Sequence, residues 1–408
     1  MPEAYIIDAC RTPRGIGRVG KGALADIHPQ QVAATVLRAI ADRNDLDTSQ
    51  IDDIVWGTSN QMGKQGGDLA RMAALDAGFD VQASAMTLDR FCGSGITAVN
   101  IAAAQIMSGM EALVIAGGTE MMSYSAAQAP PMPDAGNMRL RARHPQAMPG
   151  VCADAIATLE GIDRAALDAL SLASQQRADH AIRNGYFDRS LAPVHHEDGS
   201  LALDREEYPR PQTTLEGLAS LKPAFEALAD LPVAPGDVTF GDLIRQKYPD
   251  LKIEHVHHAG SSSGVVDGAA ALLLASPSYA AANGLKPRAR IVATANAGDC
   301  PTLMLNAPVP AARKVLKKAG LTVEDIDLFE INEAFAVVAE KFIRDLRLDR
   351  DRVNVNGGAI ALGHPIGATG AILIGMMVDE LERRDLKRGL VTMCAAGGMA
   401  PAVIIERV

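Results

Sequence analysis

The feature that most constrains the fold is an α/β pattern that occurs twice in the chain. The first copy has a buried strand at residues 4–9, a helix after 28–29 with one apolar face, and a strand at 54–56. The second has a strand at 290–293, an amphipathic helix at 309–316 and a strand at 328–331. Two copies so far apart in sequence exclude a solenoid. They predict two similar α/β halves that pack about a pseudo-twofold axis.

Each half then continues with a Gly-containing turn, an apolar helix and a strand. In the first half, Cys92 stands before a helix that runs to Ser108, and a strand follows at 113–118. In the second half, His364 stands before a helix that runs to about Arg384, and a strand follows at 390–394. If a pseudo-twofold axis relates the halves, the two helix starts face one centre. Cys92 and His364 could meet there as nucleophile and base.

Between the halves the sequence changes in character, with a Pro-rich loop at 127–133 and three nearby arginines, Arg139, Arg141 and Arg143. Such a cluster is most often a solvated face; the alternative is an interface or a phosphate contact. We expect an inserted loop domain that binds ligand. The predicted domains are 1–122 plus 263–285 for the N-terminal half, 123–262 for the loop domain, and 286–408 for the C-terminal half.

Charge and composition limit the possible partners. The chain has 39 Lys and Arg against 49 Asp and Glu, a net charge of -10, which argues against nucleic-acid binding. No apolar run approaches the ~20 residues that span a bilayer, and the first residues lack a signal-peptide pattern, so we expect a cytoplasmic protein with no membrane partner. The five cysteines are scattered without a CxxC pair, which indicates neither a zinc site nor a disulfide framework.

Cys92 is the strongest candidate nucleophile. It lies between a predicted strand at 86–88 and the helix start, where the helix dipole and free backbone N–H groups would lower the thiol pKa. The flanking glycines, Gly93 and Gly95, leave the backbone open to a ligand. The alternative is a small buried cysteine with a packing role.

Two further residues follow strands of the second half. Cys394 ends an apolar strand and precedes a turn at 395–398; taken alone, it could equally be a core residue. Asn332 directly follows the strand at 328–331. It could be a helix N-cap, or an amide that orients an oxyanion at the carboxyl end of a strand.

Together these segments resemble the thiolase family. Six family motifs occur in the expected order over nearly the whole chain, at 89–95, 117–123, 259–264 with 267–270, 332–336, 363–365, and Cys394. One such motif would be weak support, but six in order are specific. The resemblance implies a duplicated thiolase-type α/β fold, with two similar halves in a five-layered αβαβα arrangement and an inserted loop domain.

The resemblance also implies a chemistry, acyl transfer between CoA thioesters. Cys92 would attack the 3-keto carbon of a 3-ketoacyl-CoA with His364 as base, and Cys394 would protonate the departing enolate and then deprotonate CoA. His364 with an Asn332-bound water would form one oxyanion hole, and the amides of Cys92 and Ala396 the other. CoA is then a co-substrate, and no permanently bound cofactor is expected.

For substrate binding, the resemblance points to four residues. Arg210 would lie near the nucleotide of CoA and Ser263 near the pantetheine, with Met148 and Phe335 as further substrate contacts. The alternatives are a surface charge for Arg210 and, for Ser263, a hydroxyl that bonds its own backbone. Family membership also implies a homodimer or homotetramer.

Two departures from the family pattern concern the acyl group. Residues 148–150 read Met-Pro-Gly where the family has His-Met-Gly, and an insertion at 226–254 brings apolar residues, Phe240, Leu243 and Ile244, that we expect to line a larger pocket. Both favour a degradative enzyme for a medium, branched or ring-derived 3-ketoacyl-CoA. The alternatives are a biosynthetic acetoacetyl-CoA thiolase and, more distantly, a non-catalytic acyl-CoA-binding protein.

Three histidines, His255, His257 and His258, follow the insertion. Because no acidic or cysteine partner accompanies them in the sequence, we expect no metal site there.

Overall fold

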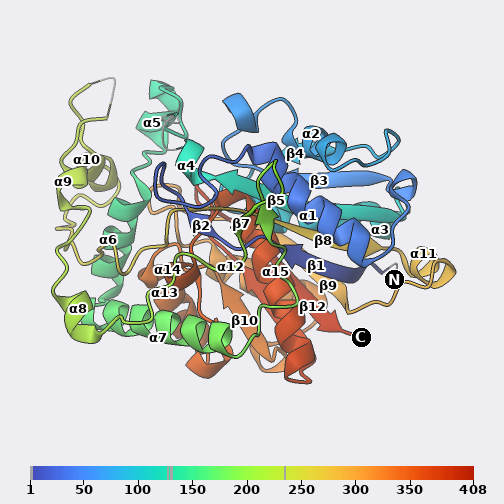
Figure 1. Cartoon of the computed structure of the whole chain (residues 1–408). Helices are drawn as coiled ribbons and strands as arrows, with labels where there is room; N and C mark the ends of the chain where they lie inside the picture. Colours follow the sequence, from blue (N-terminus) through green and yellow to red (C-terminus); the bar gives the residue numbers. More distant parts are fainter. Residues whose placement is uncertain (1–2, 126–127, 129–131, 234–235) are drawn as a thin grey trace.

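A computed structural model describes residues 3–125, 128, 132–233 and 236–408 of the chain. The N-terminal and C-terminal α/β halves pack together, and the segment between them, drawn from green to yellow, extends to one side (Figure 1). The predicted loop at 127–133 lies mostly outside the described residues.

The first half contains a mixed sheet with the strand order β4-β3-β5-β8-β1. In it, β3 runs parallel to β4 and β5, while β8 runs antiparallel to β5 and β1. A short strand, β2, pairs with β8 outside this order. The bounds are β1 Tyr5–Arg11, β2 Gly15–Ile16, β3 Asp53–Gly57, β4 Met86–Leu88, β5 Leu113–Met121 and β8 Val266–Ala275.

The second half repeats this arrangement with β10 (Leu328–Ile331), β11 (Arg388–Thr392), β12 (Met399–Arg407) and β9 (Ala289–Gly298), in the order β10-β11-β12-β9. Here β10 is parallel to β11, and β12 is antiparallel to β11 and β9. A parallel bridge to Val353 extends β10 where β4 extends β3. The shared order and directions confirm the predicted duplication, and β1 joins the two sheets by pairing with β9.

Helices form three layers around these sheets. One outer layer holds α1 (Pro29–Arg43) and α2 (Leu69–Asp76), the central layer holds α3 (Ser94–Ser108) and α15 (Ile366–Arg383), and the other outer layer holds α12 (Pro308–Ala319) and α13 (Ala336–Leu346). Strand residues alternate between these layers. In β5, for example, Val114 and Ala116 pack in the core of the central layer, while Leu113 and Ile115 pack with α1. The fold is the predicted five-layered αβαβα arrangement.

Glycines let the two central helices touch. A Cβ on Gly95 of α3 would lie 2.8 Å from the Ala371 nitrogen of α15, and a Cβ on Gly370 would lie 2.1 Å from the Ile96 nitrogen. Any side chain at these positions would therefore force the helices apart. This close approach brings the segments that precede the two helices to the same end of the central layer.

The segment between the halves consists mainly of helices: the long helix α7 lies along one edge with α8 at its end, and α9 and α10 pack with α6 (Figure 1). Its elements are α4 Met122–Ser125, α5 Met138–Arg143, α6 Pro149–Glu160, α7 Arg164–Arg183, β6 Val194–His195, β7 Leu201–Leu203, α8 Leu215–Ala219, α9 Glu226–Ala229 and α10 Phe240–Arg245; in the two halves, α11 is Pro277–Ala282 and α14 is Ala359–Leu362. The domain boundaries given above stay a prediction.

Two expectations for this segment are wrong. Arg141 is buried rather than solvated, and its Nε donates to Asp134 at 2.7 Å. Arg139 and Arg143 are exposed. In the insertion, Phe240, Leu243 and Ile244 are at most 8% exposed and belong to the core cluster that contains much of α6. They fill space within this core, so they do not line an open acyl pocket.

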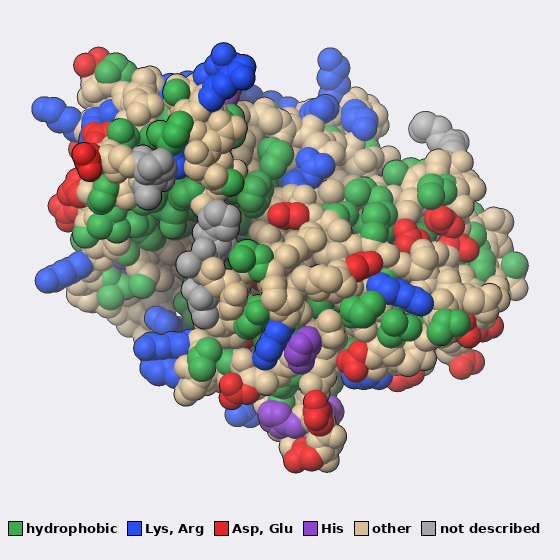
Figure 2. All heavy atoms as spheres, turned by 90° about the horizontal axis from the view of Figure 1, so that it is seen from above, with side chains coloured by type: hydrophobic (Ala, Val, Ile, Leu, Met, Phe, Trp, Pro, Cys, Tyr) green, Lys and Arg blue, Asp and Glu red, His purple; other side chains and the backbone are tan. Residues whose placement is uncertain are grey.

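The stretch Phe91–Ser108, which contains helix α3, is long and apolar enough to cross a membrane, but 67% of it is buried inside the molecule. A core helix of a soluble protein can have the same length and composition, so this is weak support for a membrane span. On the face drawn in Figure 2, Lys and Arg side chains are scattered among acidic and apolar ones.

Candidate active site

Cys92 lies in a sharp turn between β4 and α3. Phe91 has φ 50°, a left-handed conformation, and its N–H donates to the Asp89 carboxylate at 2.6 Å. The Ser94 hydroxyl accepts from the Arg90 N–H at 2.8 Å and donates to the Phe91 carbonyl at 2.7 Å. These bonds fix the elbow that presents the thiol at the start of α3.

The expected low pKa of Cys92 is wrong for the ligand-free protein. Burial raises its pKa to about 12, and the carboxylate of Glu120 adds to the rise. Glu120 is itself buried, and it accepts backbone N–H groups from Ser59 and from Gly367 of α15. Because the resting group is a thiol, the nucleophile needs a base that removes its proton.

His364 fits the role of such a base. Its Nδ1 lies 2.6 Å from the Thr369 hydroxyl, which itself donates to the Pro365 carbonyl. The hydroxyl proton is thereby occupied, so Nδ1 must be the donor and Nε2 carries the lone pair. Nε2 is buried and has no hydrogen-bond partner among the described residues, and burial lowers the His364 pKa to about 4. A neutral imidazole with a free acceptor nitrogen results.

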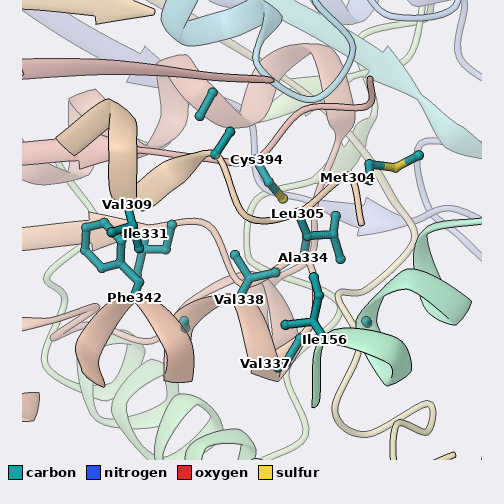
Figure 3. Close-up of a cluster of buried hydrophobic side chains, with 14 of the residues drawn as sticks. Ile156, Met304, Leu305, Val309, Ile331, Ala334, Val337, Val338, Phe342 and Cys394 are labelled. Carbon is teal, nitrogen blue, oxygen red and sulfur yellow. The ribbon is translucent and has the colours of Figure 1, made fainter. Parts of the chain in front are cut away.

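Cys394 is 1% exposed, and burial, together with charge on Cys92, raises its pKa well above the ordinary value of a thiol. The residues that follow each cysteine, Gly93 and Ala395, lie next to each other, because a Cβ on Gly93 would be 3.4 Å from the Ala395 Cβ. Figure 3 shows the sulfur of Cys394 directed toward Leu305 and Ala334. The thiol thus faces an apolar surface on one side.

The turn after Cys394 packs against the start of α3. A Cβ on Gly93 would lie 3.4 Å from the Ala395 Cβ, and Ala395 and Met399 exchange two backbone hydrogen bonds. The left-handed positions of this turn are Gly397 and Gly398, with φ 76° and 75°. Ala396 is outside the left-handed region, so its methyl group imposes no strain and its N–H remains a candidate oxyanion donor.

Asn332 is the most unusual polar residue of the site. It is 1% exposed, and neither Oδ1 nor Nδ2 has a hydrogen-bond partner among the described residues. It is not a helix N-cap, because α13 begins at Ala336 with Phe335 as its cap. A buried amide without partners indicates a position where water or ligand binds.

Sequence reasoning missed two residues that hold the site in place. Thr369 fixes the His364 tautomer. The sequence feature that could have indicated it is its position in the first turn of α15, close to His364. Glu333 is buried and accepts from Ser174 at 2.6 Å and from Asn354 at 2.9 Å, which anchors the loop that carries Asn332. No local pattern links these distant partners in the sequence.

A groove of about 200 Å³, here called the Arg210 groove, lies beside these loops. Its lining is Gln175, Tyr208, Arg210, Gln212, Thr213, Thr214, Gly217, Leu218, Leu221, Ala259, Gly260 and Ile360. Of the four predicted substrate contacts, only Arg210 lines it. Arg210 is exposed and stacks on the Tyr208 ring, with 5.3 Å from Cζ to the centroid.

Ser263 lies between the Arg210 groove and His364. Its N–H donates to the Ala334 carbonyl at 3.0 Å, and the next residue, Gly264, accepts the His364 N–H at 2.9 Å. Its place near the pantetheine of CoA stays a prediction.

Met148 and Phe335 are half-buried at the edge of the core cluster that contains Cys394. Met148 caps α6, and the Phe335 ring meets the Phe225 ring edge-on, with 5.7 Å between centroids. A Cβ on Gly150 would lie 2.3 Å from the Phe225 ring. The Phe225 ring therefore packs against residues 148–150, the Met-Pro-Gly segment that departs from the family pattern.

The three histidines do have acidic partners, contrary to the expectation from sequence. His255 and His257 each place Nδ1 2.8 Å from the carboxylate of Asp154, and His258 contacts Asp168 at 2.7 Å. Among the described residues, no group of three or more His, Cys, Asp or Glu is arranged to hold a metal ion.

Comparison with known proteins decides the family. Residues 4–243 match the family model described as the thiolase N-terminal domain, and 285–407 match the thiolase C-terminal domain. The chain belongs to the thiolase family. It is therefore an acyltransferase, as the arrangement of two cysteines, a histidine and an unpaired amide suggests.

The similarity spans the whole chain. A 3-ketoacyl-CoA thiolase of Cronobacter sakazakii is 40% identical over 100% of both chains, and a beta-ketoadipyl-CoA thiolase of Pseudomonas knackmussii is 40% identical over 100% of this chain and 99% of that protein. Among solved structures, human mitochondrial 3-ketoacyl-CoA thiolase in complex with CoA has a TM-score of 0.85 at 33% identity, covering 100% of this chain and 98% of that chain.

Proposed function

We propose that this thiolase cleaves a 3-ketoacyl-CoA with CoA, giving acetyl-CoA or another short acyl-CoA and a shortened acyl-CoA, in a reaction that also runs backward as a Claisen condensation. The observation that carries the proposal is the pair of buried groups without hydrogen-bond partners among the described residues, Nε2 of His364 and the side-chain amide of Asn332. A protein that only binds acyl-CoA would not need them.

In the first step, Nε2 of His364 takes the proton of Cys92, and the thiolate attacks the 3-keto carbon. The resulting oxyanion is held by His364 and by a water on Asn332. The bond between C2 and C3 then breaks, which leaves the acyl group on Cys92 and the electron pair on the enolate of the departing acyl-CoA. Cys394 gives its proton to C2 of this enolate.

In the second step, Cys394, now a thiolate, takes the thiol proton of incoming CoA. The CoA thiolate attacks the acyl-Cys92 thioester, and the amides of Cys92 and Ala396 hold the second oxyanion. Cys92 leaves as a thiolate and recovers its proton from His364. The side chains of Cys92, His364 and Cys394 therefore serve both steps, Asn332 serves the first, and CoA is a co-substrate.

The Arg210 groove supports a site for CoA near the reaction centre. The Arg210 side chain can pair with a phosphate or stack on the adenine, and it lies on an otherwise acidic protein of net charge -10. The segment 259–264 runs from this groove past Ser263 to the backbone of His364. Pantetheine following this segment would bring the CoA thiol toward Cys92.

The acyl group is medium-length, branched or ring-derived in this proposal, and the pathway is degradative. The support is the Met-Pro-Gly sequence at 148–150, beside the half-buried rings of Phe225 and Phe335, together with the similarity to a beta-ketoadipyl-CoA thiolase. The second candidate function is acetoacetyl-CoA synthesis. It is favoured because the apolar residues of the insertion pack in the core and do not line a larger acyl pocket.

Steady-state kinetics with 3-ketoacyl-CoAs of graded acyl size tests both the activity and the choice of substrate. Each enclosed methylene contributes about 0.8 kcal/mol, so four more carbons should raise kcat/KM about 100-fold over acetoacetyl-CoA. Both acyl-CoA products should be found by mass spectrometry. An equal or higher kcat/KM for acetoacetyl-CoA contradicts the proposed specificity, and no acyl-CoA product with any substrate contradicts the activity.

The protein is proposed to act in the cytoplasm as a homodimer or homotetramer. β4 is an edge strand, its first residue, Met86, is 37% exposed, and Val81 in the turn before it is 74% exposed. Such an edge commonly pairs with another chain. Light scattering should give two or four copies per particle, and a monomer at assay concentration contradicts this assembly.

A further inference from the structure

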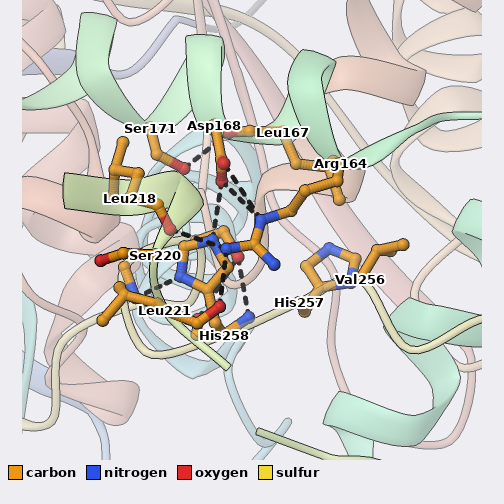
Figure 4. Close-up of polar contacts among 12 residues, drawn as sticks. Arg164, Leu167, Asp168, Ser171, Leu218, Ser220, Leu221, Val256, His257 and His258 are labelled. Carbon is orange, nitrogen blue, oxygen red and sulfur yellow. Dashed lines mark hydrogen bonds and ion pairs between the residues drawn. The ribbon is translucent and has the colours of Figure 1, made fainter. Parts of the chain in front are cut away.

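A set of polar side chains, of which Asp168 and His258 are buried and Arg164 is half-buried, joins α7 to the lining of the Arg210 groove (Figure 4). The Nε of Arg164 lies 3.0 Å from both carboxylate oxygens of Asp168, one turn along the helix. The Nη2 of Arg164 donates to the carbonyls of Leu218 and Leu221 at 2.7 and 2.9 Å. Both leucines line the groove. Arg164 therefore fixes the position of this part of the lining.

The same carboxylate also reaches Gly260 through His258, and a Cβ on Gly260 would lie 2.6 Å from Leu218, so Gly260 packs beside the leucines that Arg164 holds. Nε2 of His258 lies 2.7 Å from Asp168, and Nδ1 lies 3.0 Å from the N–H of Gly260, a groove residue. The N–H can only donate, so Nδ1 is the acceptor and Nε2 carries the proton given to Asp168. His258 is thus neutral in this arrangement, and the orientation of its ring depends on Asp168.

His258 also organises the turn that leads to the catalytic residues. Its N–H donates to the Ser261 hydroxyl at 3.0 Å, and its carbonyl accepts the Ser262 hydroxyl at 2.9 Å. Two residues later, the Gly264 carbonyl accepts the N–H of His364. The backbone of residue 258 therefore holds the turn toward the catalytic residues, while its imidazole holds Gly260 of the groove, so a side-chain substitution affects the groove alone.

We propose that Arg164, Asp168 and His258 form a positioning network that holds Leu218, Leu221 and Gly260 in the lining of the Arg210 groove for CoA, and that protonation of His258 weakens CoA binding. The inference rests on the proposed function, because it takes the groove as the CoA site. None of the three residues contacts the reacting atoms, so their effect should appear in the KM for CoA rather than in kcat.

The direction of the pH effect follows from the surroundings of His258. The charged and titratable groups that face it are Asp168 and Arg164 of α7 and His257 of its own segment; burial dominates and lowers the His258 pKa below its ordinary 6.5. At pH 7 the ring is neutral. In acid, a protonated Nδ1 would point its hydrogen at the Gly260 N–H and break that bond. The KM for CoA should therefore rise below pH 6.5 and stay flat above it.

Acid also lowers the folding stability that His258 contributes. Because the folded-state pKa of His258 lies below its unfolded value, its contribution to stability is complete above pH 6.5 and falls as the pH drops below that value. The kinetic assays therefore need circular dichroism at each pH, to show that the protein remains folded.

Two substitutions separate the contacts of His258. His258→Asn keeps an acceptor near the Nδ1 position but loses Asp168, whereas His258→Gln keeps a donor near Nε2 but loses the bond from Gly260. We expect His258→Gln to raise the KM for CoA about 10-fold with kcat changed less than about 2-fold, and to remove the acid rise in KM. His258→Asn should raise KM less. His255→Asn is the matched control, since His255 contacts Asp154 outside the groove.

A substrate that lacks the nucleotide of CoA tests whether the effect of His258 depends on the Arg210 groove. A 3-ketoacyl thioester of N-acetylcysteamine, with free N-acetylcysteamine as acceptor, lacks the nucleotide, so His258→Gln should leave its turnover unchanged. The inference is overturned if His258→Gln impairs both substrates equally, if His255→Asn has the same effect, or if the wild-type KM for CoA does not rise at any pH below 6.5 at which circular dichroism shows the protein folded. Wild-type protein inactive on both substrates would instead contradict the proposed function itself.

Discussion

Cys92→Ser is expected to lower thiolysis by on the order of 10⁴-fold or more and to abolish acyl transfer to the protein. A serine hydroxyl is a much weaker acid than a thiol, and the buried site that raises the Cys92 pKa to about 12 would disfavour an alkoxide still further. His364 could not generate a useful nucleophile from it. The measurement is the initial rate of CoA consumption with the preferred 3-ketoacyl-CoA.

The control is Cys10→Ser, in a buried thiol that donates to the Val36 carbonyl and lies away from the site. It should retain most of the activity at a temperature where the variant stays folded. If Cys92→Ser keeps more than about 1% of the wild-type rate while folded, Cys92 is not the nucleophile.

The second large effect is expected for Cys394→Ala. Without a proton donor for the enolate and a base for CoA, overall turnover should fall by about 10²- to 10⁴-fold, the usual contribution of a general acid-base group. The alanine leaves Cys92 and its base, His364, in place. Alkylation of Cys92 by iodoacetamide should therefore proceed at close to the wild-type rate.

These two readouts separate a chemical role of Cys394 from a packing role. Cys394 is a member of the core cluster, so a destabilised variant would lose activity and also change the reactivity of Cys92. Activity near the wild-type level would mean that another group carries the proton. Loss of Cys92 alkylation together with activity would mean that Cys394 holds the site together.

The sequence predicted the fold because its signals are local. The strand at 113–118 and the helix after Cys92 follow from periodicity and turn residues, and the same pattern in the second half predicts the duplication that the strand order confirms. The insertion was harder, because Leu243 and Ile244 are apolar on an amphipathic helix whether they face a pocket or a core. Only the packing against α6 distinguishes the two.

At the site, the sequence identified residues but not their surroundings. The expected low pKa of Cys92 rested on the helix dipole, which acts within the first turn; burial and Glu120 outweigh it, and both depend on contacts distant in sequence. The carboxylates that hold the histidines were missed for the same reason. Asp154 and Asp168 lie about a hundred residues before their partners.

The most direct test of the account is the identity of the acylated residue. The wild-type enzyme, incubated with the preferred 3-ketoacyl-CoA without CoA and then quenched in acid, should gain one acyl group, and peptide mapping by mass spectrometry should place it on Cys92. Addition of CoA before the quench should remove it. An acyl group mapped to Cys10, Cys152, Cys300 or Cys394, or product formation with no CoA-sensitive adduct, would contradict a mechanism through acyl-Cys92.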